Sequence, residues 1–590
     1  MIESVSPTEP PPRRAGRNRC KTRVVLPSMA GDDARDLARS LGVTATFGAL
    51  LHGRGLGNDD LTRRYLEPKL AHLTAPHEMA GRAEAIDRIV RAVRAHERIA
   101  LFGDYDCDGI TAVAILTEVL TALGGDVTPL LAERFGGGYG VSEPAVDRIL
   151  EVRPSLLLTC DCGSSDHVRL ERIRKAGIDA IVIDHHLVPV EPLPVLAFLN
   201  PRRTDCPFPF KHLASCGLAL SVAAGVRTAM NSDYDVRRCL DLVAIGTVAD
   251  VMPLSGDNRV LVRAGFRQLE RAERPGLRCL AERANLVLGA GVTSETIAFD
   301  LAPRINGPGR LASPSLALEL LLATDPHVAR ELAGSLEAVR TERRLIQQRI
   351  LDEALAEIAD CSFDRDPAIV IGRQGWHSGV VGIVAANVVE RTGKPAVVIS
   401  FDGDVGRGSV RAPEGTPIYD LLQASKDALI TFGGHQAAAG LELRASELTR
   451  FRELFCAAML AHQSASGGPT PVSEVDDAAD VLMDPRDAPY DVVRNFDLLE
   501  PCGMGNPQPR VGLSRARVAR VQPVRGGHLQ VQLALDGGHT LYGFGQMMGA
   551  RAGEFPMGSR VDAVGGLRRD SYRGGDAVGF RVESIQPSST

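Results

Sequence analysis

The sequence has few aromatic residues, no long apolar run and no excess of positive charge. Aromatic side chains make up 4% of its 590 residues, with a single tryptophan, so any base-stacking surface must be built from few side chains. A membrane-spanning helix needs about 18 or more consecutive apolar residues, and the sequence contains no run of this length. We therefore expect no membrane span. The formal net charge of −6 gives no general attraction for polyanions, so a phosphate-binding surface must be local.

The sequence also lacks a disulfide framework, a zinc-binding cysteine pattern and a secretory signal. Its 11 cysteines are an odd number and are scattered, which predicts reduced thiols in a cytoplasmic protein. The first 25 residues are rich in proline and arginine and contain no apolar core of the kind that secretory signals have. We therefore expect residues 1–30 to be a disordered tail.

Short apolar runs alternate with helical patterns between residues 80 and 265. Residues 99–102, 156–159 and 180–183 are predicted strands, and residues 111–123 and 168–176 are predicted helices. This alternation is typical of a doubly wound α/β domain with a parallel sheet. Ligands of such sheets bind at the carboxyl ends of the strands.

Four further regions and a linker complete the predicted organisation. An N-terminal helical segment covers residues 31–79, and a helical connector covers residues 266–366. The longest helix of the connector is predicted at 327–358, and its Gly/Pro-rich segment PRINGPGR, residues 303–310, is predicted to be a loop. A second, smaller α/β domain covers residues 367–463, with strands at 368–371 and 396–399 and a helix at 380–391. After a Ser/Gly/Pro linker at 464–472, short alternating segments in residues 473–590 predict a small β-barrel.

Carboxylates and histidines follow each predicted strand of the first α/β domain. The sequence places them in GDYDCDG, TCDCG, IVIDHH and, after a further apolar segment, GTVADVMPL. Taken singly, each acid is explained as a helix cap and each histidine as a surface residue. Together at one sheet edge the acids would repel one another unless cations lay between them. Such oxygen-rich ligand sets favour Mn²⁺ or Mg²⁺, and two of these ions promote displacement at phosphorus.

These four segments resemble motifs I to IV of the DHH phosphoesterase superfamily, in the form found in its RecJ family of single-strand-specific DNA exonucleases. Further segments resemble that family in the same order: LAPRINGPGRL, GWHSGVVGIVA, GRGSVRAPEG, FGGHQAAAG and LEPCGMGNPQP. The sequence departs from the commoner family pattern at Pro308, at Asn387 and at Ser215 to Gly217. None of these departures removes a presumed metal ligand.

The resemblance implies roles for individual residues. The implied ligands of two divalent cations, Mn²⁺ or Mg²⁺, are Asp106, Asp108, Asp161, His185 and Asp250. The catalytic set also includes Asp104 as a ligand or base, Asp184 to orient an imidazole, and His186 to contact the scissile phosphate or a metal. A packed or surface role stays open for His186.

The resemblance also implies substrate contacts in two places. The connector supplies Arg304, Asn306 and Arg310, and the second α/β domain, which resembles the DHH-associated domain, supplies Arg373, Trp376, His377, Ser409, Arg411, Gly433, Gly434 and His435. A core or hinge role stays open for Trp376. The barrel resembles an oligonucleotide-binding (OB) fold, which combines basic and stacking side chains.

The implied activity is a two-metal exonuclease that degrades single-stranded DNA from 5′ to 3′ in recombination and repair. A single-strand-binding protein and a helicase are implied partners. Two alternatives remain open at this point. One is a DHH phosphoesterase acting on short oligoribonucleotides or cyclic dinucleotides, and the other is an inactive nucleic-acid-binding scaffold.

Overall fold

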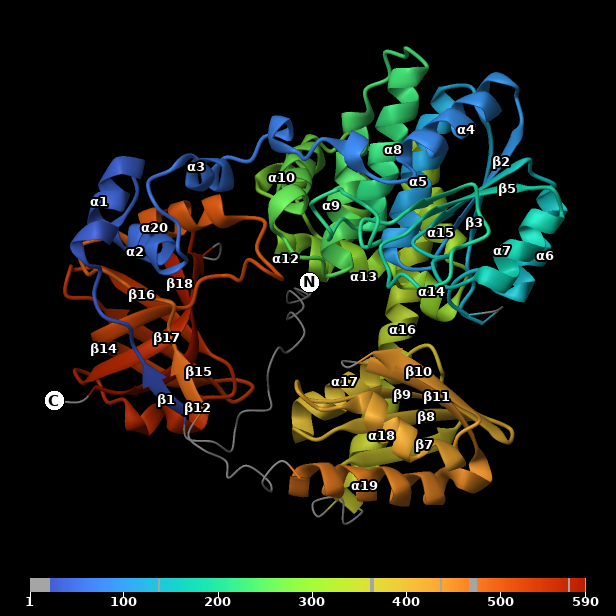
Figure 1. The fold of residues 1–590 in the computed structure, drawn as a ribbon. Coiled ribbons are helices and arrows are strands. Elements are labelled where there is room, and N and C mark those ends of the chain that lie inside the picture. The colour runs from blue at the N-terminus through green and yellow to red at the C-terminus, as the bar shows by residue number, and fades with distance from the viewer. Residues whose placement is uncertain are drawn as a thin grey trace, which may run out of the picture.

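The computed structural model describes residues 22–135, 138–360, 366–435, 438–465, 475–570 and 573–588. The structure consists of two α/β domains and a β-barrel, and one long helix joins the α/β domains (Figure 1). Within the described residues, no helix is both long and apolar enough to cross a bilayer.

The first α/β domain contains a five-stranded, wholly parallel sheet in the order β3-β2-β4-β5-β6. Its strands are β2 (Arg98–Gly103), β3 (Asp126–Leu131), β4 (Leu156–Cys160), β5 (Asp179–Ile183) and β6 (Ala197–Leu199). The surrounding helices are α4 (Arg82–Arg94), α5 (Cys107–Ala122), α6 (Glu143–Val152), α7 (His167–Lys175) and α8 (Ser215–Ala229). The predicted doubly wound fold is confirmed.

Both faces of this sheet are covered. In β2, Ile99 and Leu101 pack into one core, and the alternate residues Ala100 and Phe102 pack into another. Because successive side chains of a strand point to opposite faces, a strand buried on both sides is apolar throughout. This burial explains the short, continuous apolar runs of the sequence.

The first domain extends well beyond residue 265, the boundary expected from the sequence. That position lies inside α10, and the helices on either side of it pack in the same core as the sheet. They are α9 (Leu240–Ala249), α10 (Gly256–Arg271), α11 (Pro275–Arg283) and α15 (Ser315–Leu322); the single turn α12 (Ser294–Thr296) lies between α11 and α15 in the chain. The boundary was misplaced because these amphipathic helices have no sequence pattern that distinguishes core helices from connecting ones.

The PRINGPGR segment, expected to be a loop, forms short helical turns. A π-helical turn at Ile297–Leu301 leads into α13 (Ala302–Ile305) and α14 (Pro308–Leu311). Pro303 and Pro308 lie in the first turns of α13 and α14. Proline is tolerated there because the first N–H groups of a helix have no intrahelical partner.

Helix α16 (Pro326–Asp360) confirms the predicted long helix and joins the two α/β domains (Figure 1). Its N-terminal part buries Ala333 and Leu336 in the core of the first domain, and its C-terminal part buries Ile350 and Ala354 against the second. The helix is therefore a structural member of both domains.

The second α/β domain has a five-stranded mixed sheet in the order β10-β11-β9-β8-β7. Its elements are β7 (Ile369–Gln374), α17 (Val381–Thr392), β8 (Ala396–Asp402), β9 (Val405–Arg411), α18 (Ile418–Ala424), β10 (Thr431–His435), β11 (Ala438–Arg444) and α19 (Leu448–Ala465). Helix α19 includes the first two residues of the expected linker, 464–472, and residues 466–472 lie outside the described part.

The C-terminal domain is a β-barrel closed by pairing between β14 and β17. Its elements are β13 (Val481–Leu482), α20 (Pro489–Phe496), β14 (Val511–Val524), β15 (His528–Ala534), β16 (Thr540–Gly545), β17 (Arg560–Arg569) and β18 (Val578–Pro587). The sequence prediction of a barrel in this region is confirmed.

The N-terminal segment packs on the barrel with its first part (Figure 1), whereas Leu70, Leu73 and Met79 near its end pack against the core of the first α/β domain. Strand β1 (Thr22–Val25) pairs in parallel with β12 (Val475–Ala478), and Phe47 and Leu51 of α2 (Ala45–Gly53) join the barrel core. Helices α1 (Asp32–Leu41) and α3 (Asp60–Leu66) flank α2. The expectation of a disordered tail is thus wrong for residues 22–25, because a distant strand satisfies their backbone; residues 1–21 lie outside the described part.

Candidate metal centre and the groove beside it

The strand ends of the first domain align and bring three acids to one edge. Gly103, Cys160 and Ile183 are register partners at the ends of β2, β4 and β5, and Asp104, Asp161 and Asp184 follow them. Asp106 caps α5 by accepting the N–H groups of Asp108 and Gly109 at 3.0 and 3.1 Å. Asp250 caps the C-terminal end of α9.

One group of possible ligands surrounds His185. Its buried Nε2 lies 3.1 Å from Asp161 Oδ1, 3.4 Å from Asp250 Oδ2 and 3.9 Å from Asp108 Oδ2. That nitrogen has no hydrogen-bond partner within the described structure. A buried ring nitrogen aimed at three carboxylates fits a divalent cation.

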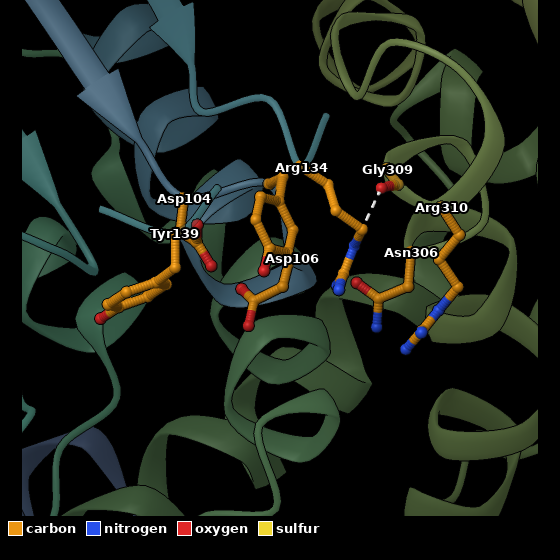
Figure 2. Close-up of a pocket in the computed structure, with 8 residues that line it drawn as sticks. Asp104, Asp106, Arg134, Tyr139, Asn306, Gly309 and Arg310 are labelled. Atoms are coloured by element: carbon orange, nitrogen blue, oxygen red, sulfur yellow. Dashed lines mark hydrogen bonds between the residues drawn. The ribbon is translucent and has the colours of Figure 1, made fainter. Parts of the chain in front are cut away.

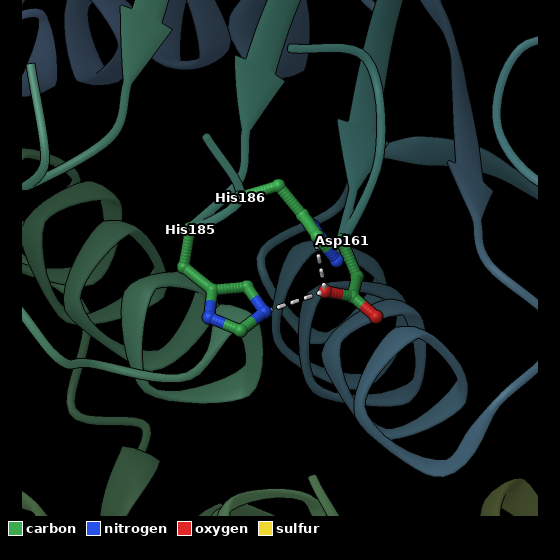
Figure 3. A group of neighbouring side chains, drawn as sticks. All are labelled: Asp161, His185 and His186. Atoms are coloured by element: carbon green, nitrogen blue, oxygen red, sulfur yellow. Dashed lines mark ion pairs between the residues drawn. The ribbon is translucent and has the colours of Figure 1, made fainter. Parts of the chain in front are cut away.

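A second group consists of Asp104, Asp106 and Asp161, whose oxygens lie within 4.8 Å of one another. Asp104 Oδ1 is buried and, in the described structure, has no hydrogen-bond partner. Figure 3 shows Asp161 facing His185 and His186, and because Asp161 also belongs to the second group, the two groups share it. The donor set fits two cations that share Asp161.

The acids carry an electrostatic penalty in the absence of cations. Burial, followed by the charge of Asp106, raises the pKa of Asp104 and of Asp161 well above the usual range. Burial and the charge of Asp108 raise the pKa of Asp250 to about 8. A bound cation would offset both contributions by favouring the ionised form.

Asp184 differs from the other acids because its oxygens are already engaged. It accepts hydrogen bonds from the Ser164 and His185 N–H groups and from Nδ1 of His186, the last at 2.8 Å. Burial opposes its ionisation, but the hydrogen bond and charge of His186 lower its pKa below the usual range. Asp184 is therefore placed to orient His186, whose pKa this pairing raises to about 9 against the effect of burial.

The N-terminus of α8 holds two of the acids. The N–H groups of Ser215 and Cys216 donate to the two oxygens of Asp108 at 2.7 and 2.9 Å, and Ser215 Oγ donates to Asp161 Oδ1 at 3.0 Å. The sequence analysis gave Ser215 no role at the centre.

A cavity of about 280 Å³ adjoins the acids. Figure 2 shows Asp104 and Asp106 on one side and Asn306 and Arg310 on the other. The lining residues are Asp104, Tyr105, Asp106, Arg134, Tyr139, Asn306, Gly309 and Arg310. Of the residues that the resemblance implied, Asp104, Asp106, Asn306 and Arg310 line the cavity.

Three lining side chains, those of Tyr105, Arg134 and Tyr139, were not expected from the sequence, and Arg134 and Tyr139 make the most informative contacts. Arg134 donates from Nε to the Gly309 carbonyl at 3.3 Å and lies over the Tyr105 ring at 4.4 Å. The Tyr139 hydroxyl lies 3.1 Å from Nδ1 of His186. Both follow β3 in the segment ERFGGGYG, whose basic and aromatic residues among glycines were the available signal.

Unpaired arginines concentrate beside the cavity. Burial, with the nearby charges of Arg134 and Arg343, lowers the pKa of Arg310 to about 10. Across the described ranges, no carboxylate forms an ion pair with Arg134, Arg310 or Arg411. Because a buried guanidinium without a counter-charge is unfavourable, this cluster fits an anion such as phosphate.

Three residues expected to contact substrate are instead bound to α16. Arg304 is buried and donates from Nε to Glu337 at 2.8 Å. Trp376 is 5% exposed and donates from Nε1 to Glu353 at 2.7 Å, and Arg373 lies 3.5 Å from the same carboxylate. None of them lines the cavity, and the burial of Trp376 leaves no ring face for a base to stack on.

The remaining expected contacts lie in the second domain, which meets the first beside the cavity. Arg310 donates to the Gly379 carbonyl at 3.4 Å, and the His377 ring packs edge-on against Phe135 at 5.5 Å. Arg411 donates to Ser409 Oγ at 2.8 Å. Gly433 and Gly434 lie in the edge strand β10, whereas the side chain of His435 lies outside the described part.

Comparison with known proteins places these features in a common architecture. Residues 98–247 match the DHH family N-terminal domain, residues 366–460 the DHHA1 domain and residues 479–584 the RecJ OB domain.

Two curated relatives and one solved structure are similar over most of the chain. The single-stranded-DNA-specific exonuclease RecJ of Bacillus subtilis is 32% identical, over 90% of this chain and 67% of the relative. Its namesake from Thermus thermophilus is 32% identical, over 88% and 72% of the two chains. The crystal structure of Thermus thermophilus RecJ in complex with Mn²⁺ is 29% identical, with a TM-score of 0.79, over 97% of this chain and 80% of the other.

We expect the substitution Asp161→Asn to abolish stabilisation by metal without unfolding the protein. Mn²⁺ should increase the free energy of unfolding of the wild type by about 2.7 kcal/mol per site at about 100 times Kd, and so raise its unfolding temperature. The variant should show little of this gain, yet unfold in chelator at or above the wild-type temperature because one buried acid is neutralised. Differential scanning fluorimetry tests this, with exposed Asp147→Asn as the control; full Mn²⁺ stabilisation of Asp161→Asn would contradict the shared-ligand assignment.

Proposed function

Because the chain belongs to the RecJ family of single-stranded-DNA-specific exonucleases, we propose that it removes nucleotides from the 5′ end of single-stranded DNA by hydrolysing phosphodiester bonds. One observation carries the proposal. The two sets of candidate metal ligands, which have Asp161 in common, lie next to a cavity that is lined by arginines. The direction of degradation, and a role in recombination and repair, are inferred from the family resemblance.

Two divalent cations, Mn²⁺ or Mg²⁺, would be held by Asp108, His185 and Asp250 and by Asp104 and Asp106, with Asp161 common to both. When bound, they lower the pKa of the attacking water and stabilise negative charge on the phosphate. Asp184 holds the ring of His186 through Nδ1 at 2.8 Å, which orients the imidazole beside the acids. His186 would thus be placed to contact a phosphate oxygen.

The arginine cluster would bind the phosphates of the strand end. Arg134 and Arg310 line the cavity from the first domain, and Arg411, with Ser409, faces Gly382 at the start of α17. Guanidinium groups can bind phosphate in a bidentate manner, with two parallel N–H···O hydrogen bonds. Positive charge on one side and the acids on the other would fix the terminal phosphodiester between them.

The barrel would hold the strand farther from the cut. Phe544, which is 37% exposed, packs against His528 at 5.2 Å, and Arg573 lies over the Tyr542 ring at 4.0 Å. Exposed rings beside a cation suit unstacked bases and the backbone that joins them. This platform and the similarity to RecJ over most of the chain favour a long strand over the oligoribonucleotides or cyclic dinucleotides of the first alternative.

The second alternative, an inactive scaffold, is disfavoured because every expected acid and His185 reach the centre.

We propose a cytoplasmic location, since the nine cysteines within the described ranges are all free thiols. A single-strand-binding protein and a helicase are proposed partners on the family resemblance alone.

Digestion of end-labelled oligonucleotides tests the activity and its direction. With Mn²⁺, a 5′-labelled strand should release labelled mononucleotide at once, whereas a 3′-labelled strand should give a shortening ladder and a blunt duplex should stay intact. If instead the 3′-labelled strand released labelled mononucleotide at once and the 5′-labelled strand gave the ladder, degradation would run from 3′ to 5′. Cleavage of dinucleotides but of neither strand would favour the small-substrate alternative.

Replacing Arg411 tests the proposed phosphate contact. Arg411→Ala should raise KM for 5′-phosphorylated DNA about tenfold, the loss of one charge-assisted hydrogen bond, with a smaller effect on kcat. The control is Arg407→Ala, which removes an exposed arginine of the same strand that pairs with Glu442. Equal KM values for Arg411→Ala and Arg407→Ala would remove Arg411 from the substrate site.

Replacing Phe544 tests the barrel. Phe544→Ala should weaken binding of a long single strand by about fivefold or more, since base stacking contributes about 1–3 kcal/mol. Turnover of a trinucleotide should not change, because it is too short to reach the barrel from the metal centre. Met557→Ala removes another exposed apolar side chain of the barrel domain and serves as the control; unchanged long-strand binding in Phe544→Ala would exclude this platform.

A further inference from the structure

Ser215 contacts two of the candidate metal ligands at once. It is the first residue of α8 and is wholly buried. Its N–H donates to Asp108 Oδ2 at 2.7 Å, and its hydroxyl donates to Asp161 Oδ1 at 3.0 Å. One residue therefore links an acid of the His185 group to the acid that both groups share.

The hydroxyl is not needed to begin the helix. The N-cap of α8 is Ala214, whose side chain cannot cap the helix. The N–H groups of Ser215 and Cys216, which have no partner within the helix, donate to Asp108 instead. Serine at a helix start commonly bonds its own backbone. Here the hydroxyl instead points out of the helix toward a carboxylate.

The oxygen that receives this hydrogen bond is the one closest to His185. Asp161 Oδ1 lies 3.0 Å from Ser215 Oγ and 3.1 Å from His185 Nε2. A carboxylate rotates readily about its Cβ–Cγ bond unless its oxygens are held. The hydroxyl restrains the rotation of Asp161 with Oδ1 toward His185, in a carboxylate that also belongs to the group of Asp104 and Asp106.

We infer that Ser215 is a positioning residue for both cations, acting through Asp161. This inference rests on the proposed metal-dependent function and assigns to it a residue that neither binds metal nor touches DNA. Groups that orient metal ligands in this way typically change metal affinity or activity by about 10- to 100-fold when they are removed.

The test is a Mn²⁺ titration of the full chain, in which free Mn²⁺ is measured by electron paramagnetic resonance. Ser215→Ala should bind at least one ion about tenfold more weakly than wild type. Ser215→Thr retains the hydroxyl and should bind Mn²⁺ within about threefold of the wild type. Ser221→Ala removes a hydroxyl of the same helix that accepts from Arg82 and should leave Mn²⁺ affinity unchanged.

Kinetics separate positioning from a general loss of structure. The kcat of Ser215→Ala should fall at low Mn²⁺ and recover at high Mn²⁺, with KM for DNA unchanged, and its unfolding temperature in chelator should stay close to that of wild type. Mn²⁺ affinity of Ser215→Ala within twofold of wild type would overturn the inference. An equal loss in Ser215→Thr would also overturn it, by assigning the effect to packing.

The same titration distinguishes this inference from the proposed function. If the wild type binds two ions and Ser215→Ala binds them equally well, only the role of Ser215 is contradicted. A wild-type chain that binds no Mn²⁺ contradicts the metal centre itself, and the inference with it.

Discussion

Repulsion among buried carboxylates at the carboxyl edge of the parallel sheet is the interaction on which the centre depends. Asp104, Asp161 and Asp184 follow strands whose ends are in register, so the fold itself brings the charges together. The structure offsets part of this repulsion with hydrogen bonds: Asp184 is satisfied by His186 and backbone N–H groups, and Asp108 by the start of α8. Asp104 Oδ1 and His185 Nε2 receive no such partner within the described structure, and this is where divalent cations fit.

The opposite charge lies on the other side of the cavity. Within the described structure Arg134 and Arg310 have no carboxylate partner, whereas Arg304 is paired with Glu337 of α16. The contact with α16 thus distinguishes Arg304 from the two arginines that line the cavity. Because α16 is packed into both α/β domains, it also fixes the distance between the acids and the second domain's Arg411.

Much of this could be predicted from the sequence because its signals are local. Short apolar runs predicted the strands that are buried on both sheet faces, and helical periodicity predicted α16. Acids placed directly after strands predicted the metal centre. What could not be predicted depended on residues distant in sequence. The pairing of Thr22–Val25 with Val475–Ala478 and the packing of Phe47 in the barrel core have no local signature.

The sequence by itself determined the main strands and helices of the α/β domains and the chemical composition of the centre, because strand periodicity and the types of side chain that follow each strand are properties of neighbouring residues. Only the tertiary structure decided how each polar side chain is used. It assigned Trp376, Arg373 and Arg304 to α16, brought Arg134 and Tyr139 to the cavity, and directed the Ser215 hydroxyl to Asp161. The physical reason is that the role of a polar group depends on the partner that satisfies it, and these partners come from elements far apart in the chain.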